Sequence, residues 1–170
     1  MSGDFEGLVG LVPEAWWQRL REEASQDPVW ASHATRASLS PLPPLAVYFY
    51  SAAGCWLLAS ELSAKTSLPL GVELNPWGRA LHVFVVDKDD AIDAFGRTAL
   101  SIVREVEAVG GRVEIGVELE AMLATLDERA WAAASAKVVR EMLASDEYRQ
   151  CARVAALRVA RATNLGGLRL

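Results

Sequence analysis

The sequence predicts an α+β fold in which one helix packs on a small antiparallel sheet, with extra helices at both ends of the chain. Two observations carry this prediction. Apolar side chains recur at helical spacing in residues 55–65 and through the C-terminal third, whereas residues 70–74 and 80–86 are typical of strands. A length of 170 residues fits one domain, with a catalytic-like core at about 45–117 and a C-terminal helical part at about 118–163.

The N-terminal part predicts one short amphipathic helix and then a long loop. Residues 13–23 begin with Pro13, which suits the first turn of a helix, and continue with apolar residues at helical spacing. Residues 26–44 contain four prolines and several serines. Because proline interrupts regular backbone hydrogen bonding, this segment is expected to be irregular.

The central segment predicts a helix followed by paired strands. The helix of residues 55–65 starts directly after Gly54, which places Cys55 at its N-terminus, and Pro69 ends it. Residues 70–74 and 80–86 read as strands joined by the turn at residues 75–78, and a charged turn at residues 87–90 leads to a short strand at 91–93. His82 and Asp93 are therefore expected on paired strands, close together at the open end of a hairpin.

The C-terminal part predicts one more strand and two helical stretches. Residues 112–117 alternate as a strand, and residues 119–143 and 146–162 have helical periodicity. The alanine-rich segment around Trp131 is expected to pack in the core rather than to form an interaction face. Residues 164–167 read as a helix stop and tail.

Composition excludes several classes of partner. The net charge of −5 leaves no basic stripe, so no nucleic-acid binding is expected. No segment has the roughly 18 unbroken apolar residues of a membrane span, and the N-terminus lacks the pattern of a secretory signal. The expected location is the cytoplasm, with non-classical export as an effector left open. Cys55 and Cys151 are expected to be free thiols, and Cys151 to be structural.

Cys55, His82 and Asp93 have the residue types and the order of a thiol catalytic triad. A thiol is a strong nucleophile only as the thiolate, which a helix N-terminus and a nearby imidazolium favour. We predict Cys55 as nucleophile, His82 as general base and acid, and Asp93 as the carboxylate that orients the ring. Backbone N–H groups of the first helical turn would stabilise the oxyanion.

Four stretches of this central region resemble small bacterial and phage cysteine-hydrolase domains of the papain-like and transglutaminase-like superfamily. They are residues 54–59 (Gly-Cys-Trp-Leu-Leu-Ala), 68–70 (Leu-Pro-Leu), 82–85 (His-Val-Phe-Val) and 92–96 (Ile-Asp-Ala-Phe-Gly). The resemblance covers roughly residues 52–97 and implies the same three roles for Cys55, His82 and Asp93. It also implies an acyl-thioester intermediate on a protein or peptide substrate, as in a protease, isopeptidase, glutamine deamidase, transglutaminase or amidase.

Many members of that superfamily carry a glutamine or asparagine upstream of the nucleophile, and residues 48–53 contain neither. This departure favours an alternative, a catalytically silent member of the fold that serves as a protein-binding module in a phage, toxin or secretion system. A metal site built from Cys55, His82 and Asp93 is a third hypothesis, although no cofactor or metal is expected.

Other residues have plainer explanations. His33 competes with His82 for the role of base, but an exposed loop histidine usually has no special function. The acidic turn at residues 87–90 lacks the ligand spacing of a calcium loop. Gly54 would leave room for a substrate carbonyl, and Trp56 and Trp77 are candidates for the walls of a substrate cleft.

Overall fold

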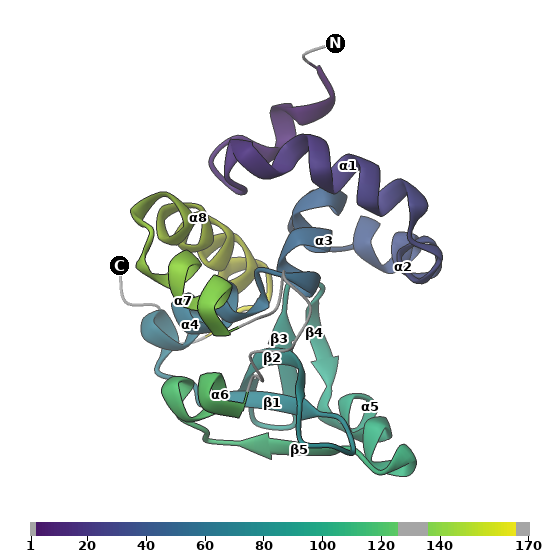
Figure 1. The fold of residues 1–170 in the computed structure, drawn as a ribbon, viewed down its shortest axis with the longest axis vertical. Coiled ribbons are helices and arrows are strands. Elements are labelled where there is room, and N and C mark those ends of the chain that lie inside the picture. The colour runs from purple at the N-terminus through teal and green to yellow at the C-terminus, as the bar shows by residue number, and fades with distance from the viewer. Residues whose placement is uncertain (1–2, 126–135, 166–170) are drawn as a thin grey trace.

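The structure, a computed structural model, describes residues 3–125 and 136–165. It is a mixed fold of helices and one five-stranded antiparallel sheet, which confirms the α+β prediction (Figure 1). The N-terminal helices α1–α3 lie at one end of the molecule and the sheet at the other, with α4, α7 and α8 beside them.

The N-terminal part is almost entirely helical, and its elements follow one another with short breaks. They are η1 (Gly3–Leu8), η2 (Glu14–Trp16), α1 (Trp17–Gln26), α2 (Pro28–Ser38) and α3 (Pro44–Ala52), where η marks a 3₁₀ helix.

The long loop predicted for residues 26–44 is wrong, because most of it forms α2. Pro28 occupies the first turn of this helix, where a missing N–H costs no hydrogen bond. Asp27 caps the helix, its carboxylate accepting hydrogen bonds from the backbone N–H groups of Val29 and Trp30. The irregular stretch is confined to residues 39–43.

The sheet has the strand order β4-β3-β2-β1-β5, with all neighbours antiparallel. The strands are β1 (Leu70–Leu74), β2 (Ala80–Asp87), β3 (Asp90–Asp93), β4 (Gly96–Ala99) and β5 (Arg112–Ile115). The predicted strands β1, β2 and β3 are confirmed to within one residue at each end. Strand β5 is also confirmed, but it ends two residues earlier than predicted. The sequence prediction did not include β4, whose four residues are too few to show a period.

Helix α4 (Cys55–Thr66) lies at the centre of the molecule and matches the predicted nucleophile helix. Its buried residues pack with Val72, Leu74 and Val83 of the sheet in one apolar cluster. On the other side α4 packs against α8 (Asp146–Ala162), a helix with six buried residues. A helix buried on both sides holds its N-terminus in a fixed place relative to the sheet.

The opposite face of the sheet is covered by a segment that the sequence prediction left unassigned. Phe84, Val86 and Val113 pack there against α5 (Leu100–Val103) and η3 (Arg104–Val109). Because both faces are covered, the sheet forms the middle layer at this end of the fold.

The C-terminal helical stretches are confirmed in the described part of the chain. They are α6 (Leu119–Thr125), α7 (Ala136–Ala144) and α8. The predicted segment around Trp131 lies outside the described residues. In the described ranges no single helix is long and apolar enough to cross a membrane; α3 and α4 meet that test only together, as a pair bent by 93°.

Candidate active site

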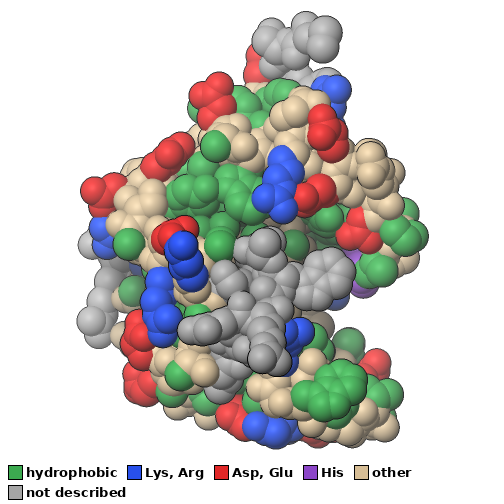
Figure 2. Space-filling view, viewed as in Figure 1, with side chains coloured by type: hydrophobic (Ala, Val, Ile, Leu, Met, Phe, Trp, Pro, Cys, Tyr) green, Lys and Arg blue, Asp and Glu red, His purple; other side chains and the backbone are tan. Residues whose placement is uncertain are grey.

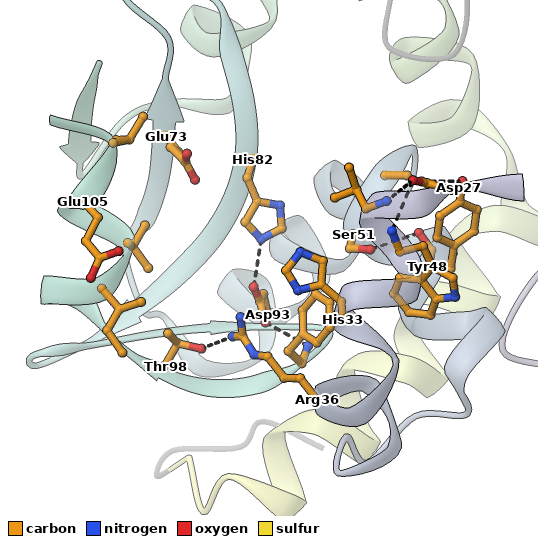
Figure 3. A pocket seen from close by; sticks show the side chains of 17 residues that line it. Asp27, His33, Arg36, Tyr48, Ser51, Glu73, His82, Asp93, Thr98 and Glu105 are labelled. Atoms are coloured by element: carbon orange, nitrogen blue, oxygen red, sulfur yellow. Dashed lines mark hydrogen bonds and ion pairs between the residues drawn. The ribbon is translucent and has the colours of Figure 1, made fainter. Parts of the chain in front are cut away.

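His82 and Asp93 are joined by a hydrogen bond at the open end of the β2–β3 hairpin. The register pairs Val85 with Ile92, so Asp93 lies diagonally across from His82 and on the same face of the sheet. The His82 Nε2 and Asp93 Oδ2 atoms are 2.8 Å apart (Figure 3). The second carboxylate oxygen accepts a hydrogen bond from the Phe95 backbone N–H at 2.8 Å, which fixes the carboxylate against the chain.

Cys55 lies beside this pair, at the first position of α4. Its thiol lies close enough to the His82 ring to contribute to the raised pKa of His82. Since Nε2 is engaged by Asp93, the ring nitrogen left to face the thiol is Nδ1. The sulfur also approaches the carbonyl oxygen of Ala52 at 4.0 Å, and the residue is only 3% exposed. The structure therefore brings the three predicted residues together in the order thiol, imidazole, carboxylate.

The His82 ring is held in its charged form. Burial alone lowers the pKa of His82, but its hydrogen bonds to Asp93 and Cys55 and the negative charges of these groups outweigh burial and raise it from 6.5 to about 10. The side chains of His82 and Asp93 are 19% and 12% exposed, so solvent screens this pair only in part. An imidazolium beside a thiol is the electrostatic setting that favours the thiolate.

This shift predicts a dependence of folding stability on pH. Because His82 binds its proton more tightly in the folded chain, its stabilising contribution is complete below pH 6.5 and is lost as the pH rises towards about 10. Asp93→Asn keeps a hydrogen-bond acceptor but removes the charge. The stabilising contribution of His82 is therefore expected to be lost at lower pH than in wild type. At pH 7 the variant is expected to be less stable by roughly 1–3 kcal/mol.

Urea unfolding followed by tryptophan fluorescence between pH 6 and 10 measures this dependence. His82→Gln serves as the reference, because it removes the titration of His82 and leaves the groups outside this site unchanged. A wild-type curve parallel to that of His82→Gln over the whole range would contradict the assigned charge state.

His82 and Asp93 line a cleft of about 550 Å³ between the sheet and the N-terminal helices. In the space-filling view, the molecule is indented on its right side between these two parts (Figure 2). Ser51 and Ala52, at the C-terminal end of α3, line the cleft on the side of Cys55, whereas Cys55 itself is not part of the lining. The thiol is thus buried next to Ala52, a residue of the cleft lining.

Helix α2 forms the wall of the cleft that faces the sheet, with Trp30, His33 and Arg36 in its lining. Arg36 stacks over the Phe95 ring at 4.5 Å and donates a hydrogen bond to the Thr98 hydroxyl, which ties α2 to the sheet. The sequence pattern offers His33 as a candidate base but assigns neither Trp30 nor Arg36 to a site, because it predicts a loop for this segment. Asp27 followed by Pro28, a capping residue and a first-turn proline, is the signal that identifies the helix.

The structure places the three predicted cleft residues elsewhere. Gly54 is buried, and a Cβ at this position would lie 2.7 Å from a ring atom of Phe49, so the glycine is needed for packing rather than for access of a substrate. Trp56 is 4% exposed in the cluster beneath the sheet, and Trp77 is 87% exposed in the β1–β2 turn. None of the three lines the cleft.

The structure also bears on the other polar residues considered in the sequence analysis. His33 faces the cleft and contacts the Phe95 ring, but His82 is the histidine that interacts with Cys55. In the acidic turn, Arg97 binds the carboxylates of Asp87 and Asp90. Across the described ranges, no three His, Cys, Asp or Glu side chains are arranged to hold a metal ion.

Comparisons of the chain with protein-family profiles, with curated proteins and with solved structures found no match. The site is therefore interpreted from its own geometry.

Proposed function

We propose that this protein is a thiol-dependent hydrolase or acyl transferase acting on amide bonds, with a papain-like or transglutaminase-like arrangement of Cys55, His82 and Asp93. The observation that carries the proposal is the His82 ring, which interacts with the Cys55 thiol and is hydrogen-bonded to Asp93 through its other nitrogen. A nucleophile, a base in contact with it and a group that orients the base are what such chemistry requires.

In the first step the Cys55 thiolate adds to the carbonyl carbon of the amide. A C–S bond forms, the C–N bond breaks, and the imidazolium proton of His82 moves to the departing amine. The resulting acyl-thioester is then attacked by water, from which His82 takes a proton, and the C–S bond breaks to release a carboxylate and the thiol. An amine in place of water gives acyl transfer, and a glutamine side chain as substrate gives deamidation with ammonia as the leaving group.

The charge that develops on the carbonyl oxygen has a natural partner in the N-terminus of α4. Within the part of the chain that the structure describes, no side chain caps this helix, so its first-turn N–H groups are not used by a capping side chain there. A twelve-residue helix also presents its positive end here. This arrangement supplies the oxyanion donors in the absence of an upstream glutamine or asparagine.

The proposal is tested by alkylation of Cys55 with iodoacetamide at pH 6.5, followed by intact mass and peptide mapping. A Cys151→Ala background removes the second thiol. We expect Cys55 to react at least roughly tenfold faster than glutathione at the same pH, because the imidazolium favours the thiolate. Release of the fluorescent amine from a library of peptide aminomethylcoumarin amides, absent in Cys55→Ser, then identifies the substrates.

A Cys55 that stays unmodified in the folded protein would overturn the enzyme proposal. That outcome favours the second candidate, a silent member of the fold acting as a protein-binding module. The burial of the thiol and the missing upstream amide side chain are the observations on its side.

A further inference from the structure

Glu73 is a cleft residue that the proposed chemistry does not use. It lies on β1 directly opposite His82 in the register, so the two side chains project from the same face of the sheet. Both line the cleft, and Glu73 extends into it from the sheet side (Figure 3). Any group that reaches the Cys55–His82 pair through this cleft therefore passes close to the Glu73 carboxylate.

The Glu73 carboxylate has no hydrogen bond or ion pair with any other residue that the structure describes. Two arginines on neighbouring elements already have partners: Arg104 of η3 binds Glu107, and Arg112 of β5 binds Glu114. On the opposite wall, Arg36 is held by Phe95 and Thr98. Burial raises the pKa of Glu73, while the charge of His82 lowers it in part, so the ionised carboxylate is only partly compensated.

The part of the sheet-side wall formed by α5 and η3 is apolar or acidic. Ile102, Val103 and Val106 line the cleft here, together with the carboxylate of Glu105. An apolar surface with carboxylates beside it suits the aliphatic stem and charged end of a lysine or arginine side chain. An acidic substrate group would instead meet like charge on this side.

We infer that Glu73 is a specificity-determining residue that selects substrates carrying a positively charged group, such as a lysine or arginine side chain or a free amine, next to the amide bond. This inference rests on the proposed function, because it assigns a substrate class to the same cleft. Glu73 acts by pairing with the substrate cation, an ion pair that is strengthened by the partial burial of Glu73, whose carboxylate has no ion pair with another described residue and is only partly compensated by the charge of His82.

The test uses three methanethiosulfonates that differ in charge: the neutral methyl, the cationic trimethylammonioethyl and the anionic sulfonatoethyl reagent. In each reaction the Cys55 thiolate attacks the sulfenyl sulfur, a disulfide forms, and methanesulfinate leaves with the electron pair of the broken S–S bond. Rates are measured by intact mass in the Cys151→Ala background. Dividing by the rate of the neutral reagent removes any change in the intrinsic reactivity of the thiolate.

We expect Glu73→Gln, which is nearly isosteric, to lower the ratio of cationic to neutral rate by roughly fivefold, the effect of one pair of unit charges about 4 Å apart at the dielectric constant of water. Glu73→Lys is expected to reverse the preference towards the anionic reagent. Glu14→Gln removes the same charge from an exposed position that does not line this cleft, and its ratio is expected to equal that of the parent protein.

The outcomes separate the two proposals. If Cys55 reacts readily but the ratio in Glu73→Gln equals that in Glu14→Gln, the role of Glu73 is overturned and the thiol chemistry stands. If Cys55 reacts with none of the three reagents in the folded protein, the proposed function fails and the substrate preference fails with it. Circular dichroism of each variant confirms that the compared proteins are folded.

Discussion

Replacing His82 with alanine is expected to slow the alkylation of Cys55 at pH 6.5 by about thirtyfold to a hundredfold. The His82 ring is charged and interacts with the thiol, whereas an isolated thiol with a pKa near 8.5 is only about 1% ionised at this pH. Removing the imidazolium removes this interaction, and Cys55 is then expected to react as an ordinary thiol does. Iodoacetamide labelling in the Cys151→Ala background measures the rate constant directly.

Variants of Asp93 provide a graded control for the same measurement. Asp93→Ala removes the acceptor of the His82 Nε2–H and leaves the ring free to turn, so a loss of reactivity between those of wild type and His82→Ala is expected. Asp93→Asn retains an acceptor and is expected to lose less. His33→Ala changes a cleft histidine that interacts with Phe95, and no loss is expected. Equal rates in wild type and His82→Ala would contradict the role of His82.

Replacing Gly54 with alanine is expected to destabilise the fold by about 1–3 kcal/mol. The added Cβ would lie 2.7 Å from a Phe49 ring atom and 2.9 Å from Tyr50 Cδ1, and both rings are completely buried. Tyr50 cannot retreat easily, because its hydroxyl donates a hydrogen bond to the Leu11 carbonyl at 2.7 Å. The new methyl group therefore has to displace the start of α4, which carries Cys55.

Thermal unfolding of Gly54→Ala measures the loss of stability, and Gly7→Ala is the matched control. A Cβ at Gly7 comes no closer than 3.4 Å to Pro43, an ordinary contact at an exposed position. Iodoacetamide labelling of folded Gly54→Ala is also expected to be slower than in wild type, since the thiol moves relative to His82. Equal melting temperatures for the two glycine variants would show that Gly54 is not required by packing.

The pattern of residues predicted the part of the site that depends on local structure. The helix beginning at Cys55 and the strands bearing His82 and Asp93 each carry their own signal of period, turn and breaker. A hairpin with a short turn has few registers, so the proximity of His82 and Asp93 could be predicted from their separation alone. Contacts between such near neighbours can be predicted without knowledge of the rest of the fold.

The cleft could not be predicted in the same way, because its walls come from segments far apart in the sequence. The prolines of residues 28–44 predicted a loop, whereas Pro28 occupies the first turn of α2, which Asp27 caps. In the sequence, Glu73 is an ordinary polar residue in the alternating pattern of a strand. Only the β1–β2 register places it opposite His82. Trp56 and Trp77 were assigned to the cleft from sequence proximity, which does not indicate the direction of a side chain.

The sequence alone determined the α+β class, the helix that starts at Cys55, and the pairing of His82 with Asp93, since all three depend on interactions between near neighbours. Only the tertiary structure decided that Cys55 lies beside the His82 ring, that its thiol is buried next to the cleft lining, and that α2 and Glu73 shape the cleft. These relations depend on how α4 packs between the sheet and α8, a matter of long-range burial that no local pattern encodes.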